Sequence, residues 1–235
     1  MNPISQIMQE SRGTFRVGVA FKNGFILNFR HWKLWVFLGL IISIVMGACM
    51  VMAGFTMVLS LLLSDLPGNA SEDQLAWALT ETLSTDPLIL GLILVALLGL
   101  FFVSPLIYNA AYRGLFFHKI EWADLVRGVP YWRTLLGVFL YLLFEAILSY
   151  IPLVSIILQI FLRPFYLFLP FVAVEGIDLG RSFSIGRRFY LPLVGVSIIV
   201  SILNELFLAL FPLMFVPLLI TAVAYGMARS IEEEL

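Results

Sequence analysis

The sequence predicts an all-α membrane protein with six transmembrane helices, and three observations lead to this fold class. The 235 residues are 61% hydrophobic and only 12% charged, whereas a soluble domain is about half apolar and about a quarter charged. The mean hydropathy is +1.02. Long uncharged runs recur along the chain, and a helix needs only about 20 apolar residues to cross a bilayer core. We therefore expect residues 1–235 to form a single integral membrane domain.

Four apolar stretches account for the six predicted spans. The first two stretches are each long enough for one helix and are joined by an outer loop at residues 65–86. The third and fourth would each be roughly 60 Å long as single helices, about twice the hydrocarbon thickness. Each must therefore cross twice, with turns near Pro152 and Pro212. The predicted spans are residues 34–64, 87–112, 134–151, 152–174, 191–210 and 212–228.

The charged residues predict the orientation of these spans. Cytoplasmic loops of membrane proteins are enriched in Lys and Arg. With six spans and a cytoplasmic N-terminus, every one of the 14 basic residues except Arg163 falls on the cytoplasmic side, while the outer loop contains acidic residues and no basic ones. The pattern indicates a multi-pass protein of a plasma or bacterial inner membrane, with both the N- and C-termini in the cytoplasm.

Similar segments recur along the chain and predict three pseudo-repeated hairpins. In the third and fifth spans a glutamate precedes a proline by seven residues, Glu145 before Pro152 and Glu205 before Pro212. Aromatic and basic residues, which favour the membrane interface, precede each odd-numbered span. Residues 17–30 carry apolar side chains at every fourth position beside basic ones, as an interfacial helix does. We expect a cytoplasmic interfacial helix before each hairpin.

Four polar residues inside the predicted spans are the main candidates for a site: Glu145, Arg163, Asn204 and Glu205. Glu145 and Glu205 should lie at matching depths about 10 Å below the outer turns, with Arg163 about 6 Å deeper and able to reach either of them. Ionisable groups in a membrane usually face one another or water. The cluster is either a structural lock between hairpins or a polar cavity for an ion, a proton or a lipid head group.

A second candidate is the basic segment before the fifth span, where Arg181, Arg187 and Arg188 can contact anionic lipid phosphates. The general enrichment of basic residues on the cytoplasmic side offers an alternative explanation for them.

One segment resembles a known family. Glu175-Gly176 is followed by Gly180-Arg181-Ser182-Phe183 and by Arg187-Arg188-Phe189, which is similar to uncharacterised six-transmembrane-helix bacterial and archaeal inner-membrane proteins. These are similar in turn to the membrane domain of membrane-anchored glycerophosphodiester phosphodiesterases. The family commonly has a small residue, a basic residue and a serine at this point. The resemblance implies a six-helix membrane fold and no catalytic residue.

Known catalytic motifs and paired metal-ligand spacings are missing from the sequence. We therefore expect no enzyme activity, no catalytic residue, no metal and no cofactor. The leading hypothesis is a non-enzymatic membrane-organising, sensing or accessory protein. The alternative is a small transporter or lipid-handling protein that uses Glu145, Arg163 and Glu205. The expected partners are the lipid bilayer and anionic lipids, and not nucleic acid.

Overall fold

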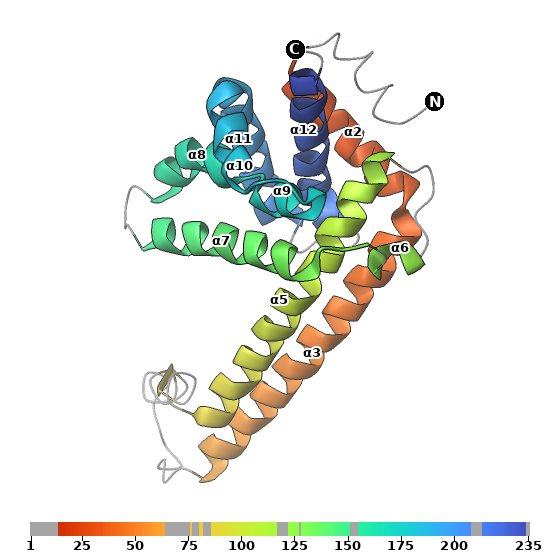
Figure 1. Cartoon of the computed structure of the whole chain (residues 1–235). Helices are drawn as coiled ribbons and strands as arrows, with labels where there is room; N and C mark the ends of the chain where they lie inside the picture. The colour runs from red at the N-terminus through yellow and green to blue at the C-terminus, as the bar shows by residue number, and fades with distance from the viewer. Residues whose placement is uncertain are drawn as a thin grey trace. The chain divides into compact units, whose positions relative to one another are not determined.

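The computed structural model describes residues 14–63, 76, 80–81, 86–116, 122–126, 128–150, 155–207 and 213–233, and these form helices and turns with no strand. Most of the predicted outer loop at residues 65–86 lies outside the described residues. The described helices are α2 (Val17–Arg30), α3 (Trp32–Leu63), α5 (Pro87–Phe116), α6 (Trp122–Val126), α7 (Tyr131–Ser149), α8 (Ser155–Tyr166), α9 (Leu169–Glu175), α10 (Gly180–Arg188), α11 (Tyr190–Phe207) and α12 (Val216–Glu233), with a 3₁₀ turn at Leu213–Phe215 (Figure 1).

The described part of the chain contains five candidate spans that are long and apolar enough to cross a membrane, Trp32–Val58, Pro87–Leu115, Tyr131–Ser149, Ile157–Glu175 and Leu213–Glu232. A sixth is added if the bent pair of α10 and α11, which meet at 103°, counts as one span. The described residues are thus helical without strands, and five or six of their helices are apolar enough to span a membrane, which confirms the predicted fold class at this level.

The chain divides into two compact units, and the smaller one contains residues 40–102. It consists of the later part of α3 and the first part of α5. Helix α5 begins where Asp86 accepts a hydrogen bond from the Leu88 amide at 2.8 Å. Large apolar side chains cover the surface of this unit, and Met50, Val51 and Phe55 are each about 70% exposed (71%, 72% and 69%). Such a surface is suited to contact with lipid chains and not with water.

The larger unit contains residues 1–39 and 103–235, and its helices approach one another closely at small residues. Helix α2 runs alongside α12 in Figure 1, where a Cβ added to Gly24 would lie 2.9 Å from the Ile220 Cα. Helices α7 and α9 meet at Gly137, where an added Cβ would lie 2.8 Å from the Leu169 carbonyl oxygen. Small residues at such crossings allow close helix packing in a membrane protein.

The segment predicted to be an interfacial helix before the first span forms helix α2, which buries two amide side chains. Asn23 and Asn28 are buried, and the Asn23 amide donates to the Val19 carbonyl at 2.9 Å. Phe21 and Phe29 face outward, with Phe29 63% exposed. Lys22 and Arg30 are exposed as well, so the outward side of α2 carries both apolar and basic side chains, the combination expected of an interfacial helix.

The predicted fourth span, residues 152–174, is interrupted in the structure. Helix α8 ends at Tyr166 and α9 begins at Leu169. Pro170 has no amide hydrogen to donate to the carbonyl of Tyr166 four residues earlier, and its ring clashes with that carbonyl in a continuous helix. The two helices still count together as one candidate span.

Candidate functional site

Glu145 on α7 and Arg163 on α8 form a two-pronged ion pair in the larger unit. The Arg163 Nε lies 2.7 Å from one carboxylate oxygen of Glu145, and Nη2 lies 2.8 Å from the other. The side chains are 8% and 19% exposed, respectively. The pair exists because α7 and α8 pack against each other, and its parallel hydrogen bonds fix the relative positions of the two helices.

Two neighbouring hydroxyl groups make further hydrogen bonds to this pair. Arg163 Nη1 donates to the Ser201 hydroxyl on α11 at 2.5 Å, and the Tyr166 hydroxyl donates to Glu145 at 3.2 Å. Arg163 therefore joins α7, α8 and α11 through three contacts. A buried ion pair whose hydrogen bonds are filled by protein groups favours a structural role over binding of a transported ion.

Of the other two residues predicted to join this cluster, Asn204 lines a neighbouring pocket and the Glu205 side chain is not described. The contact expected of Asn204 with Arg163 is made instead by Ser201, which is nearly one helical turn earlier on α11. The Glu205 side chain lies outside the described residues. Asn204 lines a small pocket of about 100 Å³ together with Tyr108, Tyr141, Leu167, Val200, Pro217, Leu218 and Thr221. The structure thus brings Glu145 and Arg163 together, while Asn204 lines the small pocket.

A second charged cluster, not identified from the sequence, lies where α9 meets α12. The Arg229 guanidinium contacts the Glu175 carboxylate at 3.0 Å, and the Tyr225 hydroxyl donates to the same carboxylate. Arg229 is also 3.5 Å from Glu232, which accepts from Arg181 on α10 at 2.9 Å. Ion pairs therefore connect α9, α10 and α12 in this cluster.

The turn between α9 and α10 places Arg181 in this cluster. Gly176 ends α9 with a φ of 82°, a left-handed conformation that glycine adopts without steric penalty. The N–H of Ile177 then donates to the Val172 carbonyl at 3.3 Å, and α10 begins three residues later at Gly180. Residues 175–181, the first part of the segment on which the family resemblance depends, therefore connect α9 to α10.

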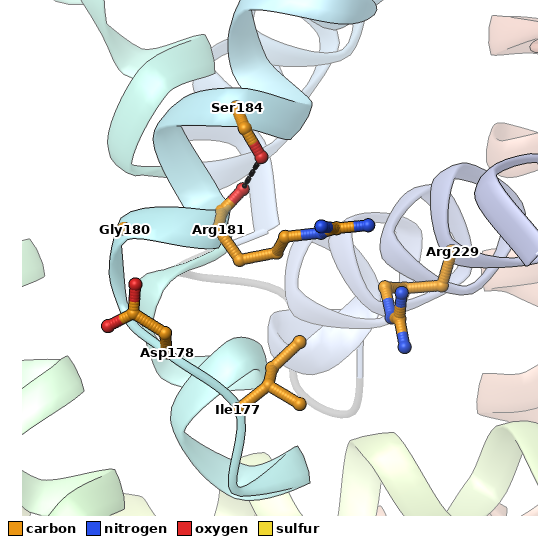
Figure 2. Close-up of a pocket in the computed structure, with 6 residues that line it drawn as sticks. All are labelled: Ile177, Asp178, Gly180, Arg181, Ser184 and Arg229. Atoms are coloured by element: carbon orange, nitrogen blue, oxygen red, sulfur yellow. Dashed lines mark hydrogen bonds between the residues drawn. The ribbon is translucent and has the colours of Figure 1, made fainter.

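An open pocket of about 570 Å³ lies beside the second cluster. Figure 2 shows its lining residues, which are Ile177, Asp178, Gly180, Arg181, Ser184 and Arg229. The Arg181 side chain is 46% exposed and uses only Nε and Nη2 to contact Glu232. Within the described residues its Nη1 has no protein partner, so one edge of the guanidinium remains available to a ligand.

The three predicted lipid-contacting arginines have different surroundings. Arg181 lines the pocket, whereas Arg187 and Arg188 are exposed in the last turn of α10 and do not line it. The Arg188 guanidinium lies 5.6 Å from the centre of the Phe189 ring. Ser182, adjacent to Arg181, is buried and donates to the Phe165 carbonyl at 2.9 Å, so its hydroxyl faces the protein interior.

The described residues contain no group of three His, Cys, Asp or Glu side chains arranged to hold a metal ion. No protein-family model, curated protein or solved structure matches this chain. The two clusters and the pocket are therefore the features from which a function can be inferred.

Proposed function

We propose that this chain is a non-enzymatic multi-pass membrane protein that binds the phosphate of phospholipid head groups, and so acts as a membrane-organising, sensing or accessory protein. The observation that carries the proposal is the pocket of about 570 Å³ lined by Arg181 and Arg229. The basic residues near it favour a position at the cytoplasmic face of a plasma or bacterial inner membrane.

The available edge of Arg181 is the group that would contact the phosphate. Guanidinium groups bind phosphate oxygens through charge-assisted hydrogen bonds of fixed geometry. Arg229 also lines the pocket, but its guanidinium is engaged with Glu175 and Glu232, so it supplies positive potential more than new hydrogen bonds. Arg187 and Arg188 would add a salt-sensitive attraction to anionic lipid, about 1 kcal/mol for each residue near a charged surface.

Two single substitutions with the same change in charge test this proposal. We expect Arg181→Gln to lower the amount of phospholipid that co-purifies with the protein in mild detergent, as measured by native mass spectrometry. Arg187→Gln is the matched control, because Arg187 lies on the same helix and is exposed but does not line the pocket. Glu232→Gln should raise phospholipid retention, since it releases the Arg181 guanidinium from its carboxylate partner.

Equal loss of lipid in the Arg181 and Arg187 variants would mean that general surface charge, and not the pocket, retains the lipid. Thermal unfolding of each variant in the same detergent checks that Arg181→Gln remains folded, and Glu232→Gln gives an independent test because the proposal expects a gain.

We further propose that the chain is built from three hairpin units, with α3, α7 and α11 as equivalent first helices. In support, a buried residue stands four positions after the residue that precedes each of these helices. These residues are Trp35 after His31, Thr134 after Pro130 and Leu193 after Phe189.

The short helices before the first and third of these segments also correspond. In each case one residue forms the break between the short helix and the next helix, and the two residues have nearly the same backbone conformation. His31 has φ −110° and ψ 28°, and Phe189 has φ −107° and ψ 30°. Counting back seven, four and three residues from each break reaches buried positions in both helices. These positions are Gly24, Leu27 and Asn28 in α2, and Ser182, Ile185 and Gly186 in α10.

A second candidate function, a small transporter or lipid-handling protein, rests on the small pocket beside the Glu145–Arg163 pair. Tyr108 and Tyr141 line this pocket, and Tyr141 lies on α7 one helical turn before Glu145. We also propose a relationship to the six-helix inner-membrane family, on the basis of the segment from Glu175 to Phe189.

A further inference from the structure

The pocket beside α10 contains an unused carboxylate as well as a partly used guanidinium. Asp178 lines the pocket and is exposed. Arg181 lies three residues further along, yet pairs with Glu232 on α12 instead. Within the described part of the chain, the Asp178 side chain has no hydrogen bond or ion pair. Figure 2 shows the Arg181 side chain extending toward Arg229, while the Asp178 carboxylate turns the other way.

The balance of charge around the pocket does not suit a ligand that is purely anionic. Two cations, Arg181 and Arg229, are accompanied by three carboxylates, Asp178, Glu175 and Glu232, which gives a formal charge of 2 − 3 = −1. Two of these carboxylates are occupied by the arginines. The groups still available to a ligand are therefore one edge of the Arg181 guanidinium and the Asp178 carboxylate. These two groups point in different directions (Figure 2).

We propose that the pocket selects a phosphoethanolamine head group, with its phosphate on Arg181 and its primary ammonium on Asp178. This inference rests on the proposed phosphate-binding function and adds the identity of the head group. An ammonium donates hydrogen bonds to a carboxylate, and such charge-assisted bonds are stronger than neutral ones. The Asp178 carboxylate therefore contributes selectivity, while Arg181 contributes binding to any phospholipid.

The same contacts predict weaker binding of two other common head groups, those of phosphatidylcholine and phosphatidylglycerol. The quaternary ammonium of phosphatidylcholine has no N–H to donate to Asp178 and is bulkier than a primary ammonium. Phosphatidylglycerol has no cation, so Asp178 faces a ligand of its own sign. One charge-assisted hydrogen bond corresponds to a preference of roughly tenfold.

Competition among lipids tests the selectivity directly. Full-length protein in mild detergent is incubated with equal amounts of phosphatidylethanolamine, phosphatidylcholine and phosphatidylglycerol that have identical acyl chains, and retained lipids are measured by native mass spectrometry. We expect roughly tenfold more phosphatidylethanolamine than phosphatidylcholine on the wild type. Asp178→Asn should bring this ratio close to one, and Asp178→Glu should keep most of it. Glu81→Gln removes an exposed carboxylate elsewhere and should leave the ratio unchanged.

The source of the head group is tested with soluble glycerophosphoethanolamine as competitor. Because we place the ligand in the bilayer, this compound should displace the lipid only at large excess. Displacement at equal concentration would overturn the lipid as the source and assign the pocket to a soluble phosphoethanolamine compound.

The variants separate failure of this inference from failure of the proposed function. Arg181→Gln should reduce retention of all three lipids without changing their ratio. Retention that depends on Arg181 but shows no preference for phosphatidylethanolamine, or a preference that survives Asp178→Asn, overturns only the head-group assignment. Retention that does not depend on Arg181 overturns the phosphate site itself.

Discussion

Arg163→Leu is expected to cause the largest loss of stability of any substitution considered. The change leaves the Glu145 carboxylate largely buried without its cation and removes the donor to Ser201. Breaking a buried ion pair by removing one partner typically costs about 3–5 kcal/mol. For a chain of this size that corresponds to a drop in Tm on the order of 10 °C, measurable by thermal unfolding in detergent.

A second substitution distinguishes a structural pair from a functional one. The double variant Glu145→Gln/Arg163→Leu should recover much of the lost Tm, because replacing both members of a buried ion pair often has little net cost. Arg187→Leu removes an exposed arginine as a control and should change Tm by at most a few degrees. A double variant as unstable as Arg163→Leu alone would show that the Arg163 contacts outside the ion pair, and not the uncompensated carboxylate, account for the loss.

Gly186→Val is expected to be the second most damaging change. Gly186 on α10 packs directly against the backbone of α8, and a Cβ at this position would lie 2.7 Å from the Phe165 Cα. Backbone cannot move aside as a flexible side chain does. Overpacking of a tight contact costs about 1–3 kcal/mol, and here α10 must shift as a whole, so we expect a loss near the upper limit.

The matched control for this change is Gly18→Val. Gly18 is also a helical glycine, on α2, but it is exposed and an added Cβ would meet no atom within 4 Å. The Tm of the Gly18→Val variant should differ from that of the wild type by no more than about 2 °C. Because α10 carries Arg181, Gly186→Val should also reduce phospholipid retention. Equal Tm values for the two valine variants would contradict the close contact between α8 and α10.

The helical fold could be predicted from the sequence because hydropathy and helix length are local quantities. The first four predicted spans and the sixth correspond to candidate spans in the structure. The remaining one, residues 191–210, corresponds to α11, which follows a sharp bend after α10. The interruption after Tyr166 was not predicted, although Pro170 provided the signal. In a membrane-spanning segment a proline does not by itself end a helix, since neighbouring groups can satisfy the freed carbonyl.

The two charged clusters differ in how much of each could be predicted. Arg163 was expected to reach a glutamate because both lie in apolar segments, where an unpaired charge is costly. The cluster of Glu175, Arg229 and Arg181 was not predicted, because these residues lie near the ends of helices where charges need no special explanation. Glu175 and Arg229 are 54 positions apart, so their pairing depends on how α9 and α12 pack. The available signal was that a glutamate and an arginine lie at the ends of different spans that were predicted to face the same side of the membrane.

We propose that the pocket beside α10 faces the cytoplasm in a multi-pass membrane protein, and cysteine accessibility tests this orientation most directly. Cys49, the only cysteine in the sequence, is first replaced by serine. Single cysteines are then introduced by Glu81→Cys in the predicted outer loop and by Asp178→Cys at the pocket, both at exposed positions. In intact cells an impermeant maleimide should label position 81 and leave position 178 unlabelled until the membrane is permeabilised. Labelling of position 178 from outside, with position 81 protected, would contradict the claim.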